Sequence, residues 1–339
     1  NTVKTLPWAA VNSESSRGVF PPGRLKPDKS TNGVETPLGY TSYSEAYSAS
    51  AKSGFYSVHI WLLPYMEAGN VYNMIDFKIG QYKRMSTNGT PTNPHYNAYA
   101  TAAGLFICPS DANTGTIISE NNYRSNFGGS SPYAGAVAGT GGLADPNVLS
   151  SEGIPAGGNG AFSMGVKGLR AGEYSDGLSK TAFFSERIKG SADVPGQAVP
   201  NKSAMVTASN RSRTLMPVQT LFNDCQGYTP TASSFDFFAA GRWPPGDDWS
   251  NGWPFAGYDS TQYNHVAPPN WSGYDCGSFS AIPDAPDEHA IIAARSDHPG
   301  TVVVAFGDGH TAIVSDSVDL GVWRAVGSRN GGETTDAEL

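Results

Sequence analysis

The residues best suited to chemistry stand near the C-terminal end of the chain, where His289, His298 and His310 occur close to Asp297 and Asp308. Histidines and carboxylates can together bind a metal ion or act as general acid and base. The spacing favours neither, because no H-x-x-x-H pattern is present and an extended strand would separate His298 from Asp308 by about 30 Å at ~3.3 Å per residue. We therefore expect structural roles, with His298 hydrogen-bonded at a turn and Asp308 serving the turn backbone.

Calcium binding is the alternative that the sequence leaves open for this region. Asp308 and Asp316 lie in or beside predicted turns. Ca²⁺ prefers hard oxygen ligands, which carboxylates and the carbonyls of Gly-rich loops supply. These two aspartates are the metal candidates, and the sequence predicts no other cofactor.

Other catalytic patterns are weak. No G-x-S-x-G or phosphate-binding G-x-x-x-x-G-K-[ST] motif occurs, and Cys108 has no evident histidine and acidic partner in the sequence. Glu186 with Asp176, or Glu288 with Asp308, could form a glycosidase pair, but acids of unknown separation are more simply surface or turn carboxylates. The sequence therefore predicts a protein that is not an enzyme.

The three cysteines allow at most one intramolecular disulfide. Cys225 and Cys276 lie in similar polar loops that contain Gly and Tyr, which makes them the favoured pair. Cys108 ends an apolar run, and we expect it to be a small buried hydrophobic residue.

Four tryptophans occur among prolines and glycines, namely Trp243, Trp249, Trp253 and Trp271. Such a segment is either a loop-dense lobe packed on aromatic rings or a surface on which sugars stack. The packing interpretation is favoured, and a carbohydrate site remains the alternative.

A terminal β-hairpin would position the histidines and Asp308. The run Thr301–Phe306 is rich in β-branched and aromatic residues, and a second short apolar run extends from His310 through Val314. Gly307-Asp308-Gly309 between them predicts a tight primed turn, because Asp-Gly tolerates positive φ angles.

A short helix is expected directly after the hairpin. Asp316 can cap a helix over residues 317–326, in which Leu320 and Trp323 share one face and Gly327 ends the helix.

The remaining chain predicts few long elements. We expect helical or helix-turn-helix structure around Pro64 and a long surface excursion over 130–160. Shorter expected elements are a helix near Trp8–Val11, a helix over 98–105 leading into a strand at 105–108, and strands near 122–127, 181–186 and 290–294, the last of which could also be helical.

Composition narrows the functional classes. The chain has 339 residues with 40 Gly, 24 Pro, 15% charged and 11% aromatic residues, which indicates an ordered, loop-rich protein. A net charge of -8 and the lack of a basic cluster argue against nucleic acid and anionic lipid as partners. No window of about 18 consecutive apolar residues suggests a membrane span for the chain as given.

Several short motifs, in order along nearly the whole chain, carry a family resemblance. His298, nine intervening residues and Asp308-Gly309 resemble the H-x9-DG motif that closes a large family of planctomycete proteins of unknown function. The other matching segments are Gly18–Gly23, Trp61–Glu67, Phe106–Asp111, Asp176-Gly177, Ser185-Glu186-Arg187, Ser315-Asp316-Ser317 and Trp323–Glu333.

The resemblance implies a pilin-like or pseudopilin-like architecture in the α+β class. Members begin with a prepilin-type cleavage and methylation segment whose hydrophobic helix anchors or polymerises, followed by an exported β-rich head. In this chain that helix is expected to be missing, since residues 1–4 resemble the point just after it. We expect one head over 1–339 with an antiparallel sheet and long ordered loops. A lobe over 189–289 would precede the hairpin and helix of 290–339.

The function implied is structural. The head is expected to self-associate in a secreted, extracellular or cell-surface filament, sheath or lattice, so its partner would be a second copy of the same chain. The alternative is an adhesion module that binds cell-surface polysaccharide through the Trp-rich lobe.

Overall fold

The structure is a computed structural model. It describes residues 2–23, 56–77, 93–111, 118–128, 159–162, 168–188, 216–227, 252–256, 260–278 and 289–333, together with short strands between these ranges. Most of the excursion predicted over 130–160 lies outside the described residues, as does Trp243.

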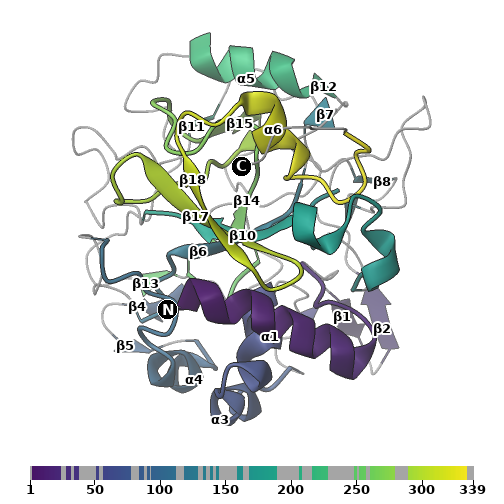
Figure 1. The fold of residues 1–339 in the computed structure, drawn as a ribbon. Helices are drawn as coiled ribbons and strands as arrows, with labels where there is room; N and C mark the ends of the chain where they lie inside the picture. Colours follow the sequence, from purple (N-terminus) through teal and green to yellow (C-terminus); the bar gives the residue numbers. More distant parts are fainter. Residues whose placement is uncertain are drawn as a thin grey trace.

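A five-stranded sheet forms the centre of the molecule (Figure 1). Its spatial order is β14 (Gln262–Tyr263), β6 (Tyr123–Asn126), β10 (Ala182–Glu186), β17 (Thr301–Phe306) and β18 (Thr311–Ser315). The strands predicted near 122–127 and 181–186 are confirmed as β6 and β10. The expectation of a purely antiparallel sheet is wrong, because β14 pairs with β6 in parallel.

The predicted terminal hairpin is confirmed, with Val303 opposite Ile313 in its register. Its turn differs from the predicted primed type. The amide of Gly309 donates to the carbonyl of Phe306 at 3.1 Å, and Gly309 is the turn residue with a positive φ, of 97°. The loop of three residues between Phe306 and His310 therefore places a single glycine in the left-handed region and leaves Asp308 in ordinary backbone geometry.

Side chains alternate between the two faces of the sheet, as the strand period requires. On β17, Val302, Val304 and Phe306 are buried on one face with Val314 of β18. Ala305 lies on the opposite face with Phe184 of β10. Both faces are covered, so the strongly apolar sequence of β17 reflects burial on two sides.

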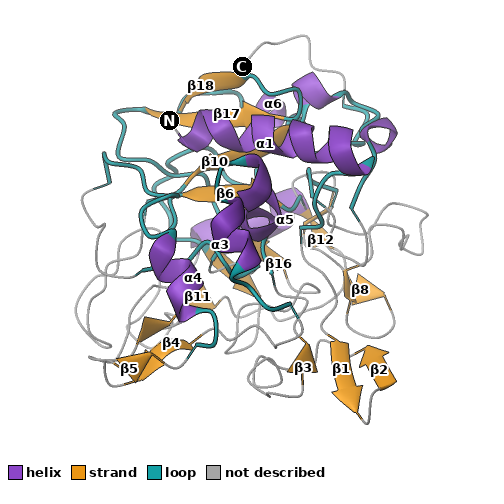
Figure 2. Ribbon diagram, turned by 90° about the horizontal axis from the view of Figure 1, so that it is seen from below, coloured by secondary structure: helices purple, strands orange, loops and turns teal. Residues whose placement is uncertain are grey.

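Helix α1 (Thr2–Arg17) packs on β10 and β17 and covers one face (Figure 2). Leu6, Ala9, Ala10 and Ser13 are its buried stripe, at the i, i+3, i+4 and i+7 positions of a helix. The sequence predicted only a short helix near Trp8–Val11. The helix was underestimated because small residues make up most of its buried face.

Further helical segments pack into the same apolar cluster as α1. They are α2 (Val58–Leu62), the 3-10 turn Leu63–Tyr65, α3 (Gly69–Asn73) and α4 (Tyr96–Thr101). The helical prediction around Pro64 is confirmed. The strand predicted at 105–108 is wrong, because these residues form turns after α4 and Phe106 is buried as a loop residue.

The other face of the sheet is covered by α6 (Leu320–Ala325), whose Trp323 is fully buried. The predicted cap is wrong. Asp319 is the capping residue, and its carboxylate accepts hydrogen bonds from the amides of Gly321 and Val322 at 2.8 and 3.0 Å. Asp316 instead accepts a hydrogen bond from the side chain of Asn270 at 2.8 Å.

A third apolar cluster surrounds a disulfide. Cys225 on α5 (Val218–Gly227) is bonded to Cys276 on β15 (Cys276–Ser278), which confirms the favoured pair. β15 pairs with β16 (His289–Ile291), so the segment near 290 is a strand. Residues 260–278, within the predicted lobe, thus supply both β14 of the central sheet and part of this cluster.

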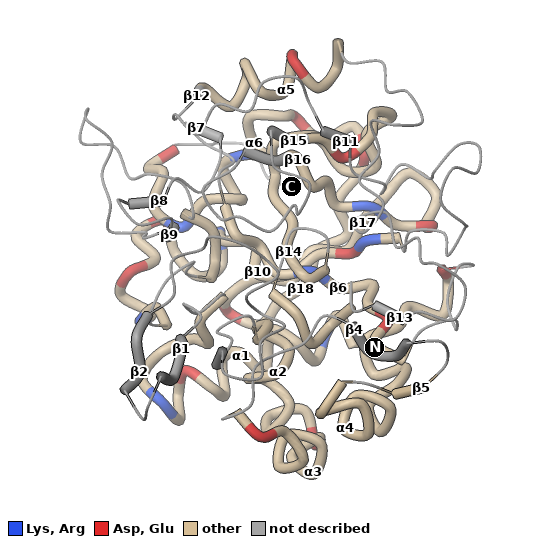
Figure 3. The backbone as a smooth tube through the Cα atoms, turned by 180° about the vertical axis from the view of Figure 1, so that it is seen from behind, with Lys and Arg blue, Asp and Glu red and all other residues tan. Residues whose placement is uncertain are grey.

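The remaining elements are short. They are β1 (Asp28–Thr31), β2 (Val34–Pro37), β3 (Ala51–Lys52), β4 (Arg84–Thr87), β5 (Thr90–Pro91), β7 (Tyr133–Ala134), β8 (Ala138–Gly139), β9 (Leu143–Ala144), β11 (Val206–Thr207), β12 (Met216–Pro217), β13 (Asp248–Trp249), and the 3-10 turns Ala171–Glu173 and Leu178–Lys180. Among the described helices, none combines the length and the hydropathy that crossing a membrane requires. Charged residues in the described part of the chain are spread over several elements (Figure 3).

Candidate functional site

Three side chains from distant segments meet beside the central sheet. The ligating atoms of Cys108, Glu186 and His298 all lie within 4.8 Å of one another. His298 Nε2 is 3.4 Å from Glu186 Oε1. The fold therefore assembles a thiol, a carboxylate and an imidazole that are separated by 78 and 112 positions in the sequence (186 minus 108, and 298 minus 186).

Glu186 is fixed at the end of β10. Its Oε2 accepts a hydrogen bond from the amide of Val303 on β17 at 2.9 Å, and its side chain is only 5% exposed. The neighbouring Ser185 donates its hydroxyl to the carbonyl of Val303, also at 2.9 Å. Two contacts to one residue of β17 thus hold this strand end in place.

Asn122 positions Cys108. The Asn122 side-chain oxygen accepts a hydrogen bond from the amide of Cys108 at 2.9 Å. Its nitrogen donates to the Asp111 carboxylate and to the carbonyl of Arg187, the latter at 2.9 Å. One buried amide therefore ties the loop that carries Cys108 to the residue that follows Glu186.

His298 is held by a turn that precedes β17. Its amide donates to Ser296 Oγ at 2.9 Å, and the Ser296 amide donates to Asn270 Oδ1 at 2.8 Å. Asn270 adopts a positive φ of 51°, a conformation that asparagine tolerates better than most residues. The predicted role of His298 as a residue hydrogen-bonded at a turn is thus observed, through its backbone.

Burial dominates the electrostatics of the site. It raises the pKa of Glu186, while the Val303 amide and His298 act in the opposite direction. Burial also raises the pKa of Tyr123, and the nearby Cys108 and Glu186 add to this shift. The Tyr123 hydroxyl therefore stays protonated at neutral pH.

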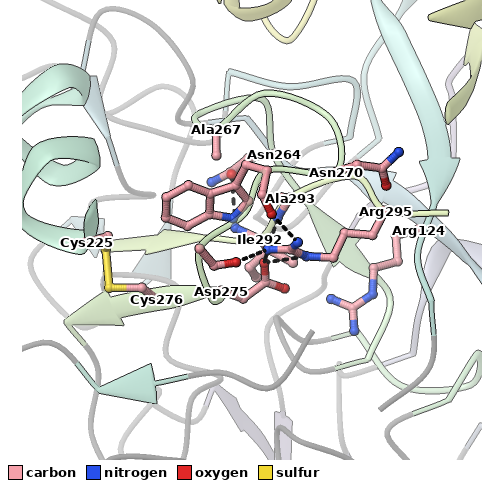
Figure 4. Close-up of polar contacts among 12 residues, drawn as sticks. Arg124, Cys225, Asn264, Ala267, Asn270, Asp275, Cys276, Ile292, Ala293 and Arg295 are labelled. Carbon is pink, nitrogen blue, oxygen red and sulfur yellow. Dashed lines mark hydrogen bonds and ion pairs between the residues drawn. A yellow bond between two sulfur atoms is a disulfide. The ribbon is translucent and has the colours of Figure 1, made fainter. Parts of the chain in front are cut away.

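Arg295 and Asp275 form a buried ion pair (Figure 4), and the backbone of Arg295 contacts that of Glu186. Arg295 Nη2 lies 3.1 Å from Asp275 Oδ1, and Arg295 also donates to the carbonyls of Trp271 and Gly273 at 2.8 and 2.9 Å. The Arg295 amide donates to the Glu186 carbonyl at 2.8 Å. Burial raises the pKa of Asp275 and lowers that of Arg295, and their mutual attraction opposes both shifts.

His298 and Asp308 do not meet. Asp308 Oδ1 instead contacts His310 Nδ1 at 2.6 Å and accepts the His310 amide at 3.1 Å, so it serves the hairpin turn as predicted. The His310 ring also stacks on Phe306 with 4.3 Å between centroids. The two ends of the H-x9-DG pattern therefore have separate partners at opposite ends of β17.

The calcium candidates are also apart. Asp308 lies in the turn before β18, and Asp316 follows the far end of that strand, where its amide donates to the carbonyl of Gly300 at 2.9 Å. The length of β18 between them prevents their sharing an ion. Calcium binding by either residue stays a prediction.

Two of the four candidate sugar-binding rings are buried. Trp253 is 0% exposed and Trp271 is 7% exposed, and both pack within apolar clusters. Trp249 is described only as a backbone position in β13. The described rings support the packing interpretation, and a polysaccharide partner stays a prediction.

The partnership of Cys108 with Glu186 and His298 is not evident in the linear sequence. Cys108 was expected to be a small buried residue without a histidine or an acid nearby, whereas the thiol is partly exposed and has both. A signal was present, since each of the three residues lies in one of the segments that carry the family resemblance. The linear sequence separates those segments, and only the pairing of β6, β10 and β17 brings them together.

The three side chains of this site are not arranged as a nucleophilic relay. In a nucleophilic relay, the imidazole bonds the nucleophile through one nitrogen and the acid through the other, so acid and nucleophile lie on opposite sides of the ring. Here the sulfur and a carboxylate oxygen lie within 4.8 Å of each other and of one imidazole nitrogen. Three potential ligand atoms this close together are typical of a binding site.

Comparisons with known proteins give a family and no function. Residues 1–321 match the family model described as "Protein of unknown function (DUF1559)". No curated protein and no solved structure matches the chain.

Proposed function

The chain belongs to the DUF1559 family of proteins of unknown function, and we propose a role for it from its own residues. In this proposal it is a non-enzymatic, secreted structural subunit that assembles with copies of itself. The assembly would be a pseudopilin-like filament, sheath or lattice at the cell surface. The observation that carries this proposal is an exposed apolar edge of the central sheet.

This β18 edge surface consists of Trp8, Ile313 and the outer edge of β18. The strand is the last one in the described sheet and carries no charged side chain. Ile313 is 73% exposed and Trp8 is 56% exposed. Soluble proteins usually protect a sheet edge with charges, prolines or bulges, so an uncharged apolar edge favours pairing with another chain.

Trp8 joins the hairpin to the N-terminal helix. A side chain on Gly309 would approach the Trp8 ring to 3.0 Å, so the indole lies over the hairpin turn. By strand alternation, Ile313 faces the same side of the sheet as α1, because its neighbour Val314 is buried on the other face. A second copy docking at β18 would cover both residues.

The packing of the elements is compatible with a pilin-like head. The hydrophobic helix that the family resemblance implies is distinct from α1, which packs on β10 and β17 as part of the head itself. The disulfide supports export, because disulfides persist in oxidising compartments and are rare in the reducing cytosol.

Sedimentation and electron microscopy of the purified protein test the proposal. We expect association that increases with concentration and buries more than about 1,000 Å² per contact. Ile313→Lys places a charge on the edge and should shift the protein to monomers without unfolding it.

Met74→Lys is the matched control, because Met74 is 46% exposed but lies after α3, away from β18. It should associate like the wild type. A wild-type protein that stays monomeric at every concentration, or an Ile313→Lys variant that assembles normally, would contradict the proposal.

A further inference from the structure

The geometry points to a transition-metal site, best suited to Zn²⁺, formed by the Cys108 thiolate, the Glu186 carboxylate and the His298 imidazole. This inference goes beyond self-assembly, and a separate set of residues carries it. The three donor atoms lie within 4.8 Å of one another.

The donor set selects the metal. Thiolate and imidazole are softer ligands than those Ca²⁺ and Mg²⁺ prefer, and Zn²⁺ accepts Cys, His and Glu together. The charges also balance, because a dication offsets one thiolate and one carboxylate while the imidazole stays neutral. A buried carboxylate such as Glu186, which is 5% exposed, gains most from such a counter-charge.

The observed spacing fits a shared ion. Zn–N and Zn–O bonds of about 2.0–2.1 Å in a tetrahedron place the two ligand atoms about 3.3–3.4 Å apart. His298 Nε2 and Glu186 Oε1 are 3.4 Å apart, beyond the usual range of a direct N–H···O hydrogen bond. The thiol completes a three-sided arrangement with them.

Outer hydrogen bonds already orient the ligands. The Val303 amide holds the Glu186 oxygen that points away from His298, and the Asn122 side chain holds the backbone of Cys108. Metal sites depend on such second contacts to fix their ligands.

The site has one open side. The His298 side chain is 38% exposed, and Cys108 is partly exposed. Three protein ligands with an open fourth position leave room for water, as in zinc sites that exchange ligands with solvent. The metal would also link the Cys108 loop, the end of β10 and the entry to β17.

Metal titration of the untagged full chain tests the site. After treatment with a chelator, we expect one Zn²⁺ to bind per chain by calorimetry. Co²⁺ should give the thiolate charge-transfer absorption and the strong visible bands of a tetrahedral complex. Absence of Zn²⁺ binding, or a Co²⁺ complex without the thiolate band, would overturn the proposal.

Alkylation provides a readout that needs no variant. Cys108 is the free thiol, since the other two cysteines form the disulfide. Zn²⁺ should protect it from iodoacetamide, and removal of the metal should restore the reaction. Equal alkylation rates with and without Zn²⁺ would refute the site.

Single substitutions then identify the ligands. Cys108→Ser, Glu186→Gln and His298→Gln should each weaken Zn²⁺ binding by at least ~10–100-fold, the loss seen even for outer partners of metal ligands. His310→Gln removes an exposed histidine that is also paired with an acid, and should bind Zn²⁺ like the wild type. Unchanged affinity in the first three variants, or an equal loss in His310→Gln, would place the metal elsewhere and overturn the assignment.

Discussion

Two fully buried histidines are neutral parts of the core. Burial lowers the pKa of both His59 and His265 to about 3, against hydrogen bonds to backbone carbonyls that act in the opposite direction. His59 Nε2 donates to the carbonyl of Tyr123 at 2.8 Å, and His265 Nδ1 donates to that of Trp323 at 2.8 Å. Each ring therefore holds one proton, and protonation would put a positive charge into the core.

The pH dependence of stability follows from these shifts. Both histidines bind protons in the unfolded chain below a pKa of about 6.5, but in the folded protein only near 3. Their contribution to the free energy of unfolding is therefore fully present above pH ~6.5 and is lost as the pH falls towards 3. Each histidine changes this free energy by up to ~1.4 kcal/mol per pH unit.

Urea denaturation between about pH 7 and pH 4 measures this slope. His59→Gln keeps a donor for the Tyr123 carbonyl and should flatten the slope by about one proton, whatever its effect on stability at neutral pH. An unchanged slope would show that His59 is not buried in its neutral form.

A close backbone contact makes Gly160 irreplaceable. A Cβ there would lie 2.3 Å from the amide nitrogen of Gly128 and 2.6 Å from the carbonyl carbon of Phe127. Gly160→Ala should lower the free energy of unfolding by at least ~1–3 kcal/mol, because backbone atoms cannot move aside like a side chain. Gly172→Ala, where nothing lies within 4 Å, should be nearly neutral in the same thermal or urea assay. An equal loss of unfolding free energy in Gly160→Ala and Gly172→Ala would contradict this contact.

At the scale of elements, α6 depends on the capping residue that the fold selects. Asp319→Ala removes the acceptor for two amides and should destabilise the protein by about 1 kcal/mol. Asp319→Asn is the matched variant, because asparagine caps a helix about as well as aspartate. If Asp319→Ala and Asp319→Asn lower the free energy of unfolding by the same amount in urea denaturation, the lost charge and not the lost cap would account for the destabilisation.

For the whole molecule, the disulfide constrains a long loop. Cys225 and Cys276 are 51 positions apart, and the loop-entropy model gives about 4 kcal/mol of stabilisation, with ~2–4 typical in practice. Reduction should lower the free energy of unfolding by this amount.

Thiol counting under denaturing conditions provides the check. The unreduced chain should show one free thiol, from Cys108, and the reduced chain should show three. A Cys108→Ser variant should show none before reduction. Three reactive thiols in the unreduced wild type would rule out the bond.

Sequence patterns predicted the elements whose signal is local. β17 and β18 were recognisable because their β-branched and aromatic runs end at Gly307 and Asp316, and β10 was recognisable from the short apolar run that ends at Glu186. The extent of α1 was not, because its buried stripe consists mainly of alanine and serine. The parallel β14 and the cap at Asp319 were missed as well. A strand of two residues, Gln262–Tyr263, or one of several aspartates carries no information about the partner it will meet.

The sequence alone determined the terminal hairpin and the family resemblance, because strand period and turn residues act over a few neighbouring positions. It also favoured the correct cysteine pair, although the two cysteines lie on α5 and β15 and not in the expected loops. The tertiary structure decided that Cys108, Glu186 and His298 share one site and that Asp308 does not. Strand pairing sets these distances, and β10 lies between β6 and β17 even though more than 50 residues separate each pair along the chain.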